Sequence, residues 1–147
     1  MRTELTFRII LENPTPGVDY GLQEGKGSKY NTIQIQKAKT GNLLFEFNAD
    51  LKTGESKAHA FTGPFVHGPA TQQFVYIDIG TPAGQKDSPW TRRLKIPLKD
   101  IDPDIIKKAT ANPKLIFETT VPGSGKDGGP NCATVKPFSG WKLKSRH

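Results

Sequence analysis

Hydrophobic and polar residues alternate along several segments of this 147-residue chain, a pattern typical of β-strands with one buried face. Near the N-terminus, Leu5, Phe7, Ile9 and Leu11 occupy every second position, and the segment from Leu43 to Leu51 repeats the pattern. Gly- and Pro-rich turns separate these segments from one another. Further strands are predicted over residues 19–23, 30–36, 74–79, 90–98 and 115–121, with a closing pair at 132–135 and 141–143.

One segment carries the start and stop signals of a helix. Asp102 suits the N-cap and Pro103 the first helical position, and Ile101 with Ile106 fits a hydrophobic staple. The Asn-Pro pair at 112–113 ends it. We therefore predict a mainly β fold, an antiparallel β-barrel or β-sandwich of about eight short strands, with one short α-helix near residues 103–110. The length fits a single globular domain over residues 1–147.

The composition favours a protein that is soluble and basic. Hydrophobic residues make up 34% and charged residues 24%, while the net charge of +7 and the pI near 9.6 suit an anionic small molecule or partner. Lys and Arg are spread along the chain, so nucleic-acid binding is expected to be weak.

No apolar stretch approaches the roughly 18 residues of a membrane span, and no membrane association is expected. Cys132 is the only cysteine, so no intrachain disulfide forms, and the cytoplasm is the default location.

A candidate site is predicted between Phe65 and Leu98, where two strands form a long-looped hairpin. If the apolar faces match, Asp78 lies opposite Arg92 on the same face as Trp90. Asp78 would then hold the guanidinium near the mouth of an apolar pocket, ready to bind a carboxylate or phosphate. The alternative is an ion pair that only caps the core. This register also pairs Phe74 with Ile96 and Tyr76 with Leu94, and a slip by one residue would reverse every face.

The second candidate is the glycine-rich loop over residues 123–129, which contains Lys126 and Asp127. Its backbone N–H groups suit an anion, although an ordinary turn is the simpler interpretation. It is not a Walker A loop, because Thr120 replaces the first glycine and Asp127 stands where Ser or Thr is required. The glycine-lysine loop at 25–28 is a weaker candidate of the same kind.

Residues for catalysis or metal binding are sparse. His59, His67 and His147 lie far apart in the sequence, and Cys132 has no second cysteine, so we expect no metal site and no cofactor. In the predicted register the aromatic residues share a face with Leu and Ile, which disfavours a nucleic-acid-binding strand surface. The leading hypothesis is a small β-rich binding module for an anionic ligand. The alternatives are an enzyme of unknown reaction with its pocket near Arg92, and a weak nucleic-acid or protein interaction module.

Six motifs carry a resemblance to a known family: Asp19–Gln23, Gly63–Phe65, Phe74–Tyr76, Ala83–Gln85, Asp87–Arg93 and Asp127–Pro130. Together they resemble a bacterial family of single-domain proteins catalogued as a domain of unknown function. The similarity extends from Arg8 to Trp141. It implies a small, stand-alone cytosolic domain, and it brings no reaction, cofactor or active site to these residues.

Overall fold

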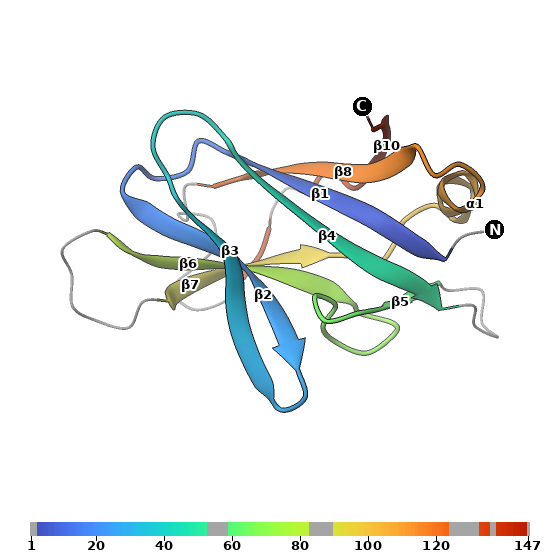
Figure 1. Ribbon diagram of the computed structural model, residues 1–147, viewed down its shortest axis with the longest axis horizontal. Coiled ribbons are helices and arrows are strands. Elements are labelled where there is room, and N and C mark those ends of the chain that lie inside the picture. The colour runs from blue at the N-terminus through green and yellow to red at the C-terminus, as the bar shows by residue number, and fades with distance from the viewer. Residues whose placement is uncertain (1–2, 53–58, 83–89, 124–132, 136–137, 147) are drawn as a thin grey trace.

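The computed structural model describes residues 3–52, 59–82, 90–123, 133–135 and 138–146, which form two five-stranded sheets and one helix (Figure 1). The first sheet has the order β10-β8-β1-β4-β5 and the second the order β3-β2-β6-β7-β9. The strands of the first sheet are β1 (Glu4–Glu12), β4 (Leu43–Lys52), β5 (Ala60–Thr62), β8 (Leu115–Pro122) and β10 (Lys142–Ser145). Those of the second are β2 (Val18–Lys26), β3 (Lys29–Lys37), β6 (Phe74–Pro82), β7 (Trp90–Pro97) and β9 (Ala133–Thr134).

The sheets pack as two layers and do not close on each other, so the predicted mainly β fold is confirmed as a sandwich rather than a barrel (Figure 1). Most neighbouring strands are antiparallel, as predicted. Two pairs of the described strands, β1 with β8 and β7 with β9, are parallel. The parallel strands β1 and β8 are joined by a long connection rather than a short crossover, because the chain forms strands of the second sheet between them.

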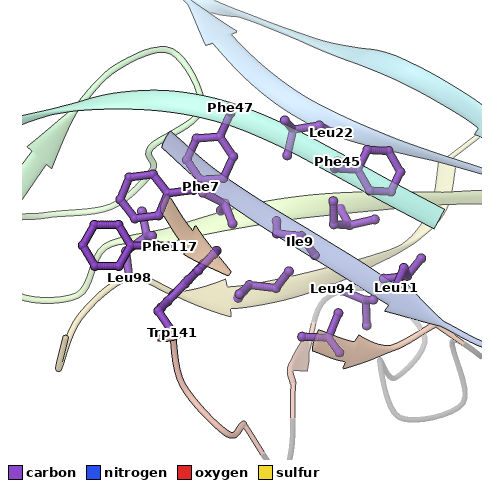
Figure 2. Close-up of a cluster of buried hydrophobic side chains, with 14 of the residues drawn as sticks. Phe7, Ile9, Leu11, Leu22, Phe45, Phe47, Leu94, Leu98, Phe117 and Trp141 are labelled. Atoms are coloured by element: carbon purple, nitrogen blue, oxygen red, sulfur yellow. The ribbon is translucent and has the colours of Figure 1, made fainter. Parts of the chain in front are cut away.

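An aromatic core joins the layers, and the alternation in β1 explains why. The four hydrophobic residues predicted to share a face are all fully buried. Phe7 lies among rings from three other segments, with centroids 5.0 Å from Phe47, 5.0 Å from Phe117 and 5.3 Å from Trp141 (Figure 2). Nε1 of Trp141 donates to the carbonyl of Pro97 at 2.8 Å, so this buried indole also has a polar partner in the second sheet.

The helix α1 (Pro103–Ala111) begins where the sequence predicts. Asp102 is the N-cap, and its carboxylate accepts from N of Asp104 at 2.9 Å. Ile101 and Ile106 are both buried, as the staple requires. Asn112 is extended and ends the helix. Among the described residues, no helix has the length and apolar character required to cross a membrane.

The β2–β3 hairpin projects beyond the two layers (Figure 1). Side-chain amides of β3 fasten its base to β4 in the other sheet. Nε2 of Gln34 donates to O of Glu46 at 2.6 Å, and Nε2 of Gln36 donates to O of Leu44 at 2.9 Å. These bonds satisfy backbone acceptors along β4 and hold the hairpin at the side of the sandwich.

Candidate functional site

Strands β6 and β7 are paired neighbours as predicted, but the predicted register is wrong by one residue. Asp78 lies opposite Arg93, whereas Arg92 lies opposite Ile79. An irregularity follows between Ile79 and Gly80, so that Gly80 pairs with Trp90. The Asp78–Arg92 pair therefore does not form, and the arginine that meets the aspartate is the next one along the chain.

The side chains that face the core explain why the observed register differs from the predicted one. Val75, Ile77 and Ile79 are buried in the core together with Leu94 and Ile96. The neighbouring residues, including the two aromatic side chains of β6, lie on the outer face of the second sheet. Branched aliphatic side chains fill the space between packed sheets efficiently, and the outer face keeps the polar partners of β6 together.

Asp78 is the centre of a polar cluster on that outer face and is only 1% exposed. Nε of Arg93 donates to its carboxylate at 2.7 Å, and Oγ1 of Thr32 donates at 2.8 Å. Nε2 of Gln23 lies 3.1 Å from the second carboxylate oxygen. Donors from β7, β3 and β2 thus converge on one residue of β6, which fixes the relative positions of four strands.

A glycine makes this convergence possible. Gly21 lies directly opposite Asp78 in the β2–β6 register. A Cβ on Gly21 would lie 2.3 Å from Cγ2 of Thr32 and 3.2 Å from the carbonyl oxygen of Ile33. Because Gly21 has no side chain, the hydroxyl of Thr32 reaches over β2 to a carboxylate that lies two strands away.

A cleft of about 580 Å³ opens beside this cluster. It is bounded by β2, β3, β6, β7 and the segment from Gly63 to Gly68, and Arg93 is part of its lining. N of Gly25 donates to the carbonyl of Pro64 at 2.6 Å and ties the hairpin to that segment. The cleft is therefore built from backbone segments that are fixed to each other.

Aromatic rings and cations line the cleft and its margin. The Tyr76 ring lies 4.8 Å from Phe74 and 5.1 Å from His67, measured between centroids. The guanidinium of Arg93 lies 4.7 Å over Tyr76, and Nζ of Lys95 lies 4.0 Å over Phe74. Each cation thus lies over a ring, an arrangement stabilised by the negative face of the π system.

His67 is held in the cleft by its backbone and by its ring. It exchanges two backbone hydrogen bonds with Phe74, of 2.9 and 3.0 Å, and its Nε2 lies 3.4 Å from the carbonyl oxygen of Gln23. Burial lowers the pKa of His67 and Arg93 lowers it further, whereas the Gln23 carbonyl and Asp78 oppose this shift. The ring is therefore neutral at pH 7 and acts as a donor to Gln23.

The predicted site residues have different outcomes. Asp78 is buried at the centre of the polar cluster, Arg92 is exposed, and Trp90 is half-buried at the start of β7. Lys126 and Asp127 lie outside the described residues, as does Cys132. No group of three His, Cys, Asp or Glu side chains within the described ranges is placed to hold a metal ion.

Five residues of the cleft region were missed: Tyr30, His67, Tyr76, Arg93 and Lys95. A signal for three of them was present in the sequence. If the uncharged aliphatic residues of β6 are taken as the core side, then Tyr76, Arg93 and Lys95 fall on the opposite face. Tyr30 and His67 come from other segments and have no such signal.

Fold and cleft together define a small β-sandwich protein with an aromatic, cationic cleft on the outer face of one sheet. Residues 5–144 match the model of DUF5990, a family of unknown function, and the chain belongs to this family. The predicted resemblance to a family of unknown function is confirmed. Neither the curated proteins nor the solved structures gave a match to this chain.

Proposed function

We propose that this protein is a binding module that takes an anionic ligand in the cleft on the outer face of its second sheet. The observation that supports the proposal is that Arg93 is held by an ion pair and is still partly exposed in the cleft. Its Nε is occupied by Asp78 at 2.7 Å, while 36% of its side chain is exposed and it lines the cleft. A guanidinium held by one edge still presents its Nη groups to a ligand.

The contacts of Arg93 limit its motion before any ligand arrives. Asp78 holds one edge of the guanidinium, and Tyr76 supports its face. In the part of the chain that the structure describes, the hydrogen bonds of this guanidinium involve Nε alone. Binding an anion at Nη therefore requires little further ordering of the side chain, which favours affinity.

The surrounding charges favour an anion over a cation. The carboxylate of Asp78 accepts from three donors and its side chain is 2% exposed, so a ligand in the cleft meets the arginine rather than the carboxylate. Lys95 adds a second cation at the margin, on the same face of β7. The net charge of +7 increases the local concentration of anions around the molecule.

Thermal unfolding with added anions tests this function. Sulfate, inorganic phosphate or a small dicarboxylate should raise the Tm, measured against sodium chloride at matched ionic strength. At ten times the Kd the stabilisation is about 1.4 kcal/mol, or about 3–6 °C for a chain of this size. R93M should abolish this shift, because Met keeps much of the aliphatic stem and removes the charge.

Arg8→Met is the matched control, because Arg8 is also ion-paired on an outer sheet face but lies in the first sheet. R8M should retain the full anion-dependent shift. The double variant D78N/R93M serves if R93M alone is too unstable, since replacing the carboxylate with a neutral amide removes the stranded buried charge. If no anion raises the Tm, or if R93M responds as the wild type does, the protein does not bind anions at this cleft.

A further inference from the structure

The cleft has an exposed aromatic surface as well as a cation. Tyr30, at the start of β3, is 65% exposed, the largest exposure among the large hydrophobic residues described. Its ring packs against His67, with centroids 5.8 Å apart, and a Cβ on Gly25 would lie 3.1 Å from its Cε1. Tyr30 is therefore supported from within the protein and presents a ring surface to the solvent in the same cleft as Arg93.

The other two aromatic side chains do not offer a comparable surface. Tyr76 has Arg93 over its ring and Phe74 has Lys95 over its ring. Each ring carries one of the two cations, Arg93 and Lys95, whose backbone positions are two residues apart on one face of β7, or about 7 Å along the strand. The cleft thus separates a stacking surface at Tyr30 from a cationic wall on β7.

We infer that the anionic ligand is a nucleotide, with its phosphate at Arg93 and its base stacked on Tyr30; this inference rests on the proposed function. A planar π system joined to a phosphate is the ligand that matches a tyrosine and a guanidinium in one cleft. The volume of about 580 Å³ falls within the ordinary range for small-molecule sites.

Two sources supply this chemistry, a free mononucleotide or a single strand of nucleic acid. A second hollow of about 160 Å³ is lined by Lys95 and Lys99 together with Phe74. Phe74 borders both hollows, so the basic surface continues past the first phosphate position. A strand would use this extension, whereas a mononucleotide would not.

Binding to three probes tests the inference, with Kd measured by isothermal titration calorimetry. The probes are ribose 5-phosphate, which has the phosphate but no base, AMP, and a six-nucleotide oligo(A). Stacking of one base should make AMP bind roughly 5- to 150-fold more tightly than ribose 5-phosphate, which is about 1–3 kcal/mol. Equal affinities for these two probes would overturn the nucleotide inference while leaving anion binding intact.

Variants of Tyr30 identify the stacking surface. Y30A should reduce AMP affinity to that of ribose 5-phosphate without changing the sulfate-dependent Tm shift, whereas Y30F should retain AMP binding. I35A is the matched control, because Ile35 is on the same strand and is 54% exposed but does not line the cleft. Unchanged AMP affinity in Y30A would overturn the inference. Failure of sulfate and AMP alike would instead refute the proposed function.

The hexanucleotide distinguishes the two sources. If it binds more than tenfold more tightly than AMP, and K95M/K99M removes this gain, the ligand is a single strand. If its affinity is no more than tenfold higher than that of AMP, a range that includes the sixfold statistical advantage of six bases, the ligand is a free nucleotide. Both results support the nucleotide inference and differ only in the source, while a hexamer that binds without any dependence on Tyr30 contradicts it.

Discussion

The outer faces of the two sheets both carry arginine–carboxylate pairs, and they use them differently. On the first sheet, Arg8 in β1 lies between Glu46 in β4 and Glu118 in β8, at 3.2 and 3.4 Å. Arg146 adds a contact of 3.0 Å to Glu46. On the second sheet, Asp78 pairs with Arg93 at 2.7 Å. The first face is a ladder of alternating charge, and the second has one enclosed carboxylate surrounded by donors.

Burial separates these two arrangements. The side chains of Arg8 and Glu46 are 23% and 30% exposed, so water and salt screen their interaction, whereas the side chain of Asp78 is 2% exposed. A partly exposed pair can be lost at little cost, but an enclosed carboxylate needs all its donors. Both faces pair an arginine with a carboxylate. The degree of burial decides whether the pair lies on a solvent-exposed surface or fixes an arginine beside a cleft.

The largest expected difference between the faces follows from removing one carboxylate from each. D78A leaves the buried amide of Gln23 and the partly buried hydroxyl of Thr32 without their acceptor, and we expect the free energy of unfolding to fall by about 3 kcal/mol. E46A removes a partly exposed acceptor and should cost less than about 1 kcal/mol. Urea denaturation of both variants measures this, and similar losses would show that burial does not distinguish the faces.

A smaller effect is expected from a substitution that crowds the outer face of the second sheet and leaves its charged residues unchanged. G21A places a methyl group where Cγ2 of Thr32 lies 2.3 Å away, which should cost about 1–3 kcal/mol. T32S alone keeps the hydroxyl donor to Asp78 and removes Cγ2. In the double variant G21A/T32S part of the loss should therefore be recovered, a coupling that a double-mutant cycle measures. Additive effects of the two substitutions would exclude the proposed crowding.

The strands and the helix were predictable because their signals are local. Every second residue of β1 is buried, and the capping residues of α1 lie within one turn of its start. The register of β6 on β7 was not predicted correctly, because apolar residues occur on both faces of β6. Val75, Ile77 and Ile79 carry no polar group, whereas the other face includes Asp78, and weighting that charge would have favoured the observed register.

The cleft was less predictable than the strands. Tyr30 comes from a hairpin and His67 from an isolated bridge to Phe74, and no sequence pattern relates them to β7. The route of Thr32 to Asp78 depends on the missing side chain of Gly21. A site assembled from non-local pairings follows from the twist and irregularities of the strands, which alternation alone does not encode.

The smallest expected effect concerns acid and compares His67 in the cleft with His59 next to β5. The pKa of each is lowered, chiefly by burial; for His59 a backbone hydrogen bond to Leu98 and the charge of Asp100 oppose the shift. The unfolded chain therefore takes up protons near the ordinary pKa of 6.5, while the folded protein does so only at lower pH. Stability should fall as the pH decreases through about 6.5.

Sulfate should change the acid destabilisation caused by His67 and leave that caused by His59 unchanged. An anion bound at Arg93 favours protonated His67, which lines the same cleft, and so raises its pKa and offsets its share of the acid destabilisation. The share of His59 should remain. Urea denaturation at pH 7.5 and 5.5, with and without sulfate, should show this offset in the wild type and in H59Q but not in H67Q. An equal effect of sulfate in H67Q would place the anion away from the cleft, and the contrast between the two faces would then lie in stability alone.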